Sequence, residues 1–263
     1  MRAKYLLSGI AVVLCLTANA QFKLNKNVLN AGSDLVSAAT LTDADVVQYA
    51  NEYMKWMDTH NPLAKATDEY GSRLKRITSK FESYDGLKLD FKVYLVKDVN
   101  AFACANGCVR VCAGLMKIMT DNEILAVVAH EIGHVKNKDS KDAFRTALLT
   151  SALKNTVASQ SNTAKTLTDS QLGDLAQAVA NSSYSRKQES AADSYSYEFL
   201  KNNGKNVWAL PSAFRKLLTI EDGGGKSSSS MAKLVSSHPE TQKRAEQAEE
   251  RAKKDGFPKV EEK

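Results

Sequence analysis

The chain has 263 residues, of which 43% are hydrophobic and 25% charged, and its mean hydropathy is −0.36. These proportions are typical of a folded globular protein and exclude disordered, collagen-like, coiled-coil and polytopic membrane chains. The net charge of +6 comes from 36 basic and 30 acidic residues that are interspersed along the sequence. Because no basic stripe with stacking aromatic residues is present, we expect no nucleic-acid partner.

Residues 1–20 have the organisation of a secretory signal peptide. A basic start and an apolar run too short to span a bilayer precede the small-x-small sequence Ala18-Asn19-Ala20. We therefore predict cleavage before Gln21 and export of the mature chain to the periplasm. The alternative is a lipoprotein signal that uses Cys15, which the bulky Leu14 before it disfavours.

The rest of the sequence predicts a helical segment, a short sheet and then helices to the end. Helical spacing, caps and turn residues predict helices over 42–59, 70–81, 121–137, 140–159, 168–182, 186–202, 207–220 and 239–255. Alternation predicts a strand over 89–96, and a glycine-serine loop follows at 223–230. We predict one domain over 21–263, with a helical N-terminal part at 34–85, a core at about 88–245 and a charged C-terminal helix.

Asn106-Gly107 predicts a β-hairpin with a two-residue turn between apolar flanks. Such a turn places Cys104 opposite Val109 and points Cys104 and Cys108 to opposite sides of the sheet, which is poor disulfide geometry. A metal site built from these two cysteines and Cys112 lacks a fourth ligand. We therefore interpret all three cysteines as small apolar residues that fill space.

The helix predicted at 121–137 contains His130-Glu131-Ile132-Gly133-His134. Residues four apart lie on one helical face, so both imidazoles can bind one Zn²⁺. Glu131 lies beside them and can activate a water molecule and move its proton. The preceding run Ile124–Ala129 is apolar and predicts a buried helix, where two histidines and a glutamate without a metal would be unfavourable. The motif is therefore typical of a zinc peptidase.

A catalytic zinc site needs a third protein ligand, and His60, His238 and a carboxylate are the candidates. Glu189-Ser190-Ala191-Ala192-Asp193 offers two carboxylates one helical turn apart. Glu189 can reach the metal while Asp193 accepts a hydrogen bond from a ligating histidine. The alternative is an ordinary amphipathic helix with surface carboxylates, and the spacing alone does not decide between the two.

Further motifs follow one another in a specific order between about Lys92 and Arg244. They are Asp98-Val99-Asn100-Ala101-Phe102-Ala103, Ala105-Asn106-Gly107, Gly114-Leu115-Met116, Thr120-Asp121-Asn122-Glu123, His130–His134, Ser185-Arg186, Glu189, Ala192-Asp193 and His238-Pro239 with Arg244. In this order they resemble the HtpX, LoiP and BepA family of zinc metallopeptidases, peptidase family M48. The sequence departs from its relatives in showing neither membrane spans nor a convincing lipobox.

The resemblance implies an α+β, mostly helical fold with a zincin-like (gluzincin) core, in which a small sheet and an edge hairpin pack on the helix with the two histidines. It implies one Zn²⁺ per chain, with the ligands His130, His134 and Glu189. Glu131 would be the catalytic base, and Asp193 would support a ligand.

Two further residues each have two possible interpretations. His238 matches a family histidine that lies near the metal, where it regulates the metal or stabilises the reacting carbonyl; otherwise it is incidental to a helix start. Arg186 either clamps a carboxylate or the substrate main chain, or forms a structural salt bridge.

The function implied is an exported zinc metalloendopeptidase that hydrolyses unfolded or misfolded envelope proteins, with peripheral association with the outer membrane or its assembly machinery. The strand at Val109–Ala113 is expected to form a sheet edge to which an extended substrate can add. The alternatives are a chaperone or outer-membrane assembly factor with secondary proteolysis, and a zinc hydrolase that does not cleave peptides.

Overall fold

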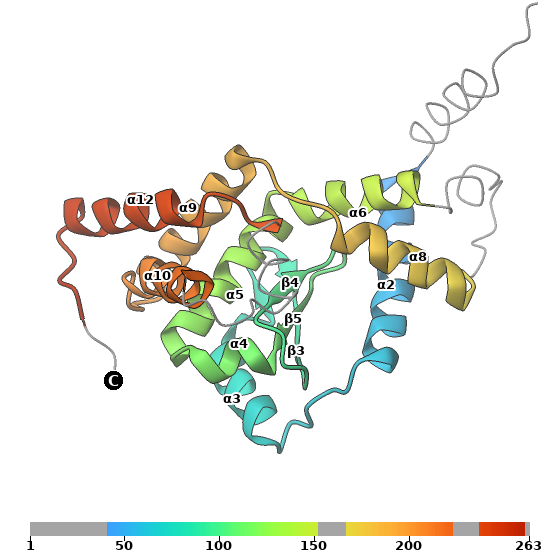
Figure 1. The fold of residues 1–263 in the computed structure, drawn as a ribbon, viewed down its shortest axis with the longest axis horizontal. Coiled ribbons are helices and arrows are strands. Elements are labelled where there is room, and N and C mark those ends of the chain that lie inside the picture. The colour runs from blue at the N-terminus through green and yellow to red at the C-terminus, as the bar shows by residue number, and fades with distance from the viewer. Residues whose placement is uncertain (1–40, 152–166, 223–236, 261–263) are drawn as a thin grey trace, which may run out of the picture.

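The computed structural model describes residues 41–151, 167–222 and 237–260, and its helices lie on both sides of a small sheet (Figure 1). The predicted signal peptide, Cys15 and the loop at 223–230 lie outside the described residues. The elements are α2 (Asp43–His60), α3 (Glu69–Thr78), η1 (Ser79–Phe81), β1 (Ser83–Tyr84), β2 (Leu87–Lys88), β3 (Asp90–Tyr94), β4 (Ala101–Ala103), β5 (Cys108–Cys112), α4 (Ala113–Ile118), α5 (Asp121–Lys136), α6 (Asp139–Thr150), α8 (Asp169–Ala180), α9 (Arg186–Asn202), α10 (Ala209–Asp222) and α12 (Thr241–Lys254). The predicted mostly helical class with a small sheet is confirmed.

Capping boxes fix where the site-bearing helices begin. The Thr120 side chain accepts a hydrogen bond from the Glu123 N–H at the start of α5, and the Glu123 carboxylate accepts one from the Thr120 N–H. The same carboxylate accepts hydrogen bonds from Ser212 Oγ at 2.6 Å and Lys216 Nζ at 2.5 Å, both on α10. The cap of α5 thus also fastens α10 beside it. Ser185 and Gln188 form an equivalent box at the start of α9.

The three-stranded sheet has the order β3-β5-β4, with β3 parallel and β4 antiparallel to β5. The expectation that Val109–Ala113 forms a sheet edge is therefore wrong, because β5 is the central strand. β3 and β4 are the two outer strands, so the chain crosses one end of the sheet between them. β4 is the outer strand that lies against α5. The other edge strand, β3, is partly covered by the segment at Leu63 and Ala64, which leaves β4 as the edge of the described sheet that an extended peptide can extend.

The register of the β4–β5 hairpin also differs from the prediction. Ala103 pairs with Val109, so Cys104 lies opposite Cys108, and the Cys104 N–H donates to the Cys108 carbonyl at 2.9 Å. The turn has three residues because Asn106 Oδ1 accepts the Cys108 N–H at 3.2 Å and Gly107 adopts a φ of 84°. The sequence-based argument that the two cysteines point to opposite sides is wrong, although both are free thiols.

Two apolar clusters lie on the two faces of the sheet. The larger joins the sheet to α5, α9, α10 and α12, and the smaller joins α2, α6 and α8 to the hairpin. In the larger cluster, α9 crosses α5 closely: a Cβ on Gly133 would lie 3.0 Å from the Ala192 Cα. This approach brings the motifs of both helices together. No helix among the described residues is both long and apolar enough to cross a membrane.

Three local differences from the prediction remain. The helix predicted at 140–159 ends at Thr150, where Ser151 is extended, and the rest of that range is outside the described residues. The short helix α4 was not predicted. The short β1–β2 hairpin was not predicted either; Asp85 and Gly86 form its turn, and both have positive φ.

Candidate metal centre

A cluster of four side chains forms where α5 crosses α9. His130 and His134 come from α5, Glu189 from α9, and His238 from the segment before α12; one ligand atom of each lies within 4.8 Å of the others. All four are buried, with exposed fractions between 0% and 8%. Residues far apart in the sequence thus meet at one point of the core.

The ligand atoms converge closely. The Nε2 atoms of His130 and His134 are 3.1 Å apart, and the Glu189 carboxylate lies 3.4 Å from His134 Nε2 and 3.6 Å from His130 Nε2. His238 Nδ1 lies 3.0 Å from Glu189 Oε1 and 3.4 Å from His130 Nε2. Two imidazole nitrogens and a carboxylate facing one point are a donor set that zinc prefers.

The outer nitrogens of both α5 histidines are held by carboxylates. His130 Nδ1 lies 2.9 Å from Asp193 Oδ1, and His134 Nδ1 lies 3.0 Å from Asp139 Oδ2. Such partners place the proton on Nδ1 and leave Nε2 free to ligate. Asp193 therefore contacts the outer nitrogen of His130. Asp139, at the start of α6, was missed; its only sequence signal is an acidic residue directly after the helix that carries the motif.

Arg244 of α12 joins the two carboxylates of α9. Its guanidinium donates to both oxygens of Asp193 at 2.6 and 2.7 Å, forms an ion pair with Glu189, and lies 4.5 Å from the centre of the Phe214 ring. The sequence marked Arg244 as part of a motif but gave it no role. Its position shows that it orients Asp193 and, through Asp193, His130.

The environment sets the charge of these groups. Burial raises the pKa of the Asp193 carboxyl, but hydrogen bonds from Arg244 and His130 outweigh burial and leave it below its usual value. Burial likewise opposes ionisation of Glu189, yet its histidine neighbours hold its pKa well below the ordinary range. Burial lowers the pKa of His130, which favours the neutral imidazole that a metal requires.

Negative charge exceeds positive charge around the cluster. Among the described residues, Glu131, Glu189, Asp139 and Asp193 face two cations, Arg244 and His134. Burial lowers the pKa of His134, but its hydrogen bonds to Asp139 and Glu189 outweigh burial and raise the pKa to about 9. Glu189 Oε2 is buried and forms an ion pair with Arg244. An excess of buried carboxylates beside converging imidazole nitrogens is the arrangement that a divalent cation completes. The residues therefore fit a bound metal ion.

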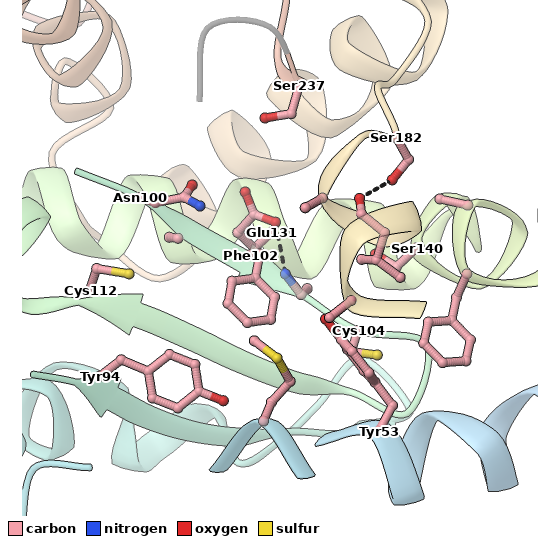
Figure 2. A pocket seen from close by; sticks show the side chains of 18 of the residues that line it. Tyr53, Tyr94, Asn100, Phe102, Cys104, Cys112, Glu131, Ser140, Ser182 and Ser237 are labelled. Atoms are coloured by element: carbon pink, nitrogen blue, oxygen red, sulfur yellow. Dashed lines mark hydrogen bonds between the residues drawn. The ribbon is translucent and has the colours of Figure 1, made fainter. Parts of the chain in front are cut away.

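Glu131 lies beside the cluster and borders a cavity (Figure 2). Its Oε2 accepts a hydrogen bond from the Ala103 N–H of β4 at 3.1 Å, and its Oε1 lies 3.7 Å from His238 Nε2. It is 3% exposed. A carboxylate placed between the edge strand and the clustered histidines can exchange a proton with a substrate held there.

The remaining candidates lie in different surroundings. Arg186 forms an ion pair with Glu240 at 2.7 Å, and its side chain is 79% exposed. His60 is exposed and stacks on Trp56 of the same helix, 4.1 Å between ring centres. Neither belongs to the cluster. Tyr184, which was missed, stacks on the His134 ring at 3.8 Å and 11°; its only sequence signal is an aromatic residue beside the Ser185-Arg186 motif.

Comparison with known proteins supports the same chemistry. The model of Peptidase family M48 matches residues 68–252. Metalloprotease LoiP of Escherichia coli (strain K12) is 37% identical over 258 residues, covering 98% of this chain and 100% of LoiP. Metalloprotease YcaL of the same organism is 38% identical over 224 residues, or 85% of this chain and 86% of YcaL. Protease HtpX of Pasteurella multocida (strain Pm70) is 46% identical over 54 residues, 19% of each chain.

Proposed function

This chain belongs to peptidase family M48, as its motifs predict, and is a metalloprotease; we propose that it is a zinc-dependent endopeptidase of unfolded polypeptides in the cell envelope. The observation that carries the proposal is the buried cluster of His130, His134 and Glu189 with Glu131 beside it. In this proposal the first three residues hold one zinc ion and Glu131 is the catalytic base.

When bound, zinc supplies a Lewis acid that polarises a carbonyl and lowers the pKa of water to about 7. Glu131 accepts the proton from the attacking water and later delivers it to the leaving amine. His238 donates a hydrogen bond to the oxygen of the reacting carbonyl, which stabilises its developing negative charge. Asp193 and Arg244 keep His130 oriented throughout, and Asp139 does the same for His134.

The edge strand β4 favours substrates in an extended conformation. A peptide that adds to β4 is bound through its main chain, which is available in unfolded segments and not in folded domains. The Ala103 N–H already points towards Glu131, so a peptide on this strand passes beside the base (Figure 2). This arrangement supports unfolded polypeptides as the substrate class.

The proposed location in the envelope rests on two observations. Residues 1–20 carry the pattern of a secretory signal, and LoiP matches the chain over nearly its whole length. We infer export to the periplasm, with peripheral association with the outer membrane. The intact mass of the exported protein tests this inference: a chain beginning at Gln21 without lipid supports it, and an acylated chain beginning at Cys15 contradicts cleavage at Gln21.

Metal content and casein cleavage by residues 21–263, with and without Glu131→Gln, test the function. We expect one zinc per chain in both proteins, because glutamine keeps the size of the side chain. Cleavage should fall by about 10² to 10⁴ or more in the variant, since the amide cannot accept the proton. Wild-type cleavage by the variant would contradict the assigned base. A wild-type protein that binds zinc but suppresses aggregation without cleaving casein would instead be a chaperone.

A further inference from the structure

The ring of Tyr184 lies flat against the ring of His134. The ring centres are 3.8 Å apart and the ring planes differ by 11°. Tyr184 belongs to the segment between α8 and α9, so it reaches the metal centre from outside the helix that carries His134. It is not one of the four residues of the cluster, and the proposed mechanism gives it no role.

We propose that Tyr184 is a positioning residue, which fixes the plane of the His134 imidazole so that Nε2 points at the metal. The inference rests on the proposed function, in which His134 is a zinc ligand, and adds a residue that controls how strongly the ion is held. The hydrogen bond from Nδ1 to Asp139 fixes one edge of the ring but leaves the ring free to tilt about that bond. A flat neighbour at 3.8 Å blocks the tilt.

The stacked ring also favours the metal-bound form of His134. The face of a phenol ring carries partial negative charge, so it attracts positive charge placed above it. An imidazole that ligates a divalent cation carries part of the positive charge of that cation. The contact with Tyr184 is therefore stronger when His134 binds the metal than when it does not, and the difference adds to the metal affinity.

Tyr184 can hold the histidine ring because it is itself anchored on three sides. Its main-chain N–H donates to the Ser237 carbonyl at 3.1 Å, and its hydroxyl lies close enough to Ser140 of α6 to interact with it. The next residue, Ser185, is the N-cap of α9. Ser140 and Ser237 both border the cavity seen in Figure 2. The phenol ring is thus tied to α6, to α9 and to the segment before α12.

A sharp turn between α5 and α6 brings both partners of this stack into place. Lys138 has a φ of 66°, which is uncommon for a residue other than glycine. Its turn lets the first two residues of α6 reach back, Asp139 to the Nδ1 of His134 and Ser140 to the hydroxyl of Tyr184. Unfavourable backbone conformations persist where the surrounding structure requires them. Two successive residues therefore hold the histidine and the ring stacked on it.

His130 provides a comparison within the same site. Its Nδ1 is held by Asp193 at 2.9 Å, as that of His134 is held by Asp139. Among the described residues, however, the aromatic rings around His130 lie 4.6 Å or more from its centre and are inclined by 65° or more. Loss of a stacked ring should therefore disturb the orientation of His134 and leave that of His130 unchanged.

Zinc affinity, measured by competition with a chelator, tests the proposal in a double-mutant cycle. Tyr184→Leu removes the stacked ring and should weaken zinc binding about threefold to thirtyfold, the range for a contact between a cation and an aromatic ring. With Asp139→Asn added, which acts on the same imidazole, the loss should be smaller than the product of the two single losses by at least about threefold. With Asp193→Asn added instead, which acts on His130, the two losses should multiply to within about twofold.

Two control variants separate positioning from a contribution to stability. Tyr184→Phe keeps the ring and should hold zinc within about twofold of the wild type. Tyr70→Leu removes a tyrosine of similar burial from α3 and should keep the wild-type zinc affinity even if its melting temperature falls. The visible spectrum of the cobalt-loaded protein depends on ligand geometry, so it should change in Tyr184→Leu and in neither control. Tyr184→Met, which keeps an unbranched side chain in the same space, takes the place of Tyr184→Leu if that variant does not fold.

The outcomes separate this inference from the proposed function, because neither readout depends on cleavage. Unchanged zinc affinity in Tyr184→Leu would overturn the positioning role, and so would losses that multiply with Asp139→Asn as they do with Asp193→Asn. Equal losses in Tyr184→Phe and Tyr184→Leu would also overturn it, since they would assign the effect to the hydroxyl. Casein cleavage would survive all three results. Coupling to Asp139→Asn in a protein that cleaves no casein would support the positioning role and contradict the peptidase.

Discussion

Two clusters of charged side chains lie on opposite faces of the sheet, and they differ in the balance of positive and negative charge. Around Arg110, which is 1% exposed, the guanidinium donates to both oxygens of Asp58 at 2.9 Å and to Asp90 at 2.8 Å. Lys92 and Tyr94 complete the coordination of Asp58, at 2.8 and 2.9 Å. Two cations thus face two carboxylates.

The metal centre has a different balance, with more carboxylates than cations. A cluster whose charges balance needs no additional ion. The Arg110 cluster stabilises the fold by joining α2 to the sheet. A buried group with an excess of carboxylates instead indicates a missing cation. The comparison therefore separates a structural ion cluster from a functional one without reference to motifs.

Of the variants that test this comparison, Glu189→Ala should have the largest effect on zinc binding and cleavage. It removes the ligand that comes from α9, and a site with two protein ligands holds zinc weakly. We expect loss of stoichiometric zinc and of casein cleavage, measured by metal analysis after gel filtration and by cleavage rate. The matched variant Glu198→Ala on the exposed side of the same helix should retain both. Full zinc occupancy in Glu189→Ala would show that His238 or another group is the third ligand.

Arg110→Met tests the other cluster. The change leaves Asp58 buried without its bidentate partner, and breaking a buried pair from one side destabilises by about 3–5 kcal/mol. Urea unfolding should show that loss, while zinc content of the folded protein stays at one per chain. Asp58→Leu combined with Arg110→Met should recover part of the stability. A zinc-deficient but equally stable Arg110→Met protein would contradict the division between the two clusters.

Asp193→Asn should have an intermediate effect on the metal centre. Asparagine keeps the shape of the side chain but loses the charge that pairs with Arg244 and orients His130. Groups that position a ligand in this way change metal affinity or activity by about 10–100-fold. Competition with a chelator measures the affinity. Asp139→Asn, its counterpart at His134, should fall in the same range; an effect of Asp193→Asn larger than that of Glu189→Ala would mean that their roles are exchanged.

These clusters also show what the sequence can predict. The two histidines, Glu131 and the starts of α5 and α9 follow from spacing along one helix and from capping residues, which are local properties. The sequence predicts Asp193 for the same reason, since it lies one helical turn from Glu189. Arg244 and Asp139 reach the site from other elements, and no local pattern states which carboxylate or imidazole they meet.

The sheet was harder to predict because its pairing depends on distant segments. The turn at Asn106-Gly107 was located correctly, but its length depends on the Asn106 side chain and on the close approach of Gly107 to Lys88, whose carbonyl lies 2.2 Å from where a Cβ would be. One residue of difference changes which cysteine faces which neighbour. The central place of β5 likewise depends on its parallel pairing with β3, which no local pattern specifies.

The smallest expected effect concerns the pH dependence of the Arg110 cluster. Burial raises the pKa of Asp58, but hydrogen bonds from Arg110, Lys92 and Tyr94 outweigh it and leave the pKa below the unfolded value of 3.8. A group with a depressed pKa in the folded state stabilises the fold above its unfolded pKa, and this contribution is lost as the pH falls through the folded value. The difference in unfolding free energy between the wild type and Asp58→Asn should therefore be constant from about pH 7 to pH 5 and shrink below pH 4. Urea unfolding at each pH measures it, with the exposed Asp174→Asn as a control that should not differ from the wild type. A difference that grows as the pH falls would mean that Asp58 is held in its protonated form, and the Arg110 cluster would then be no more balanced than the metal centre.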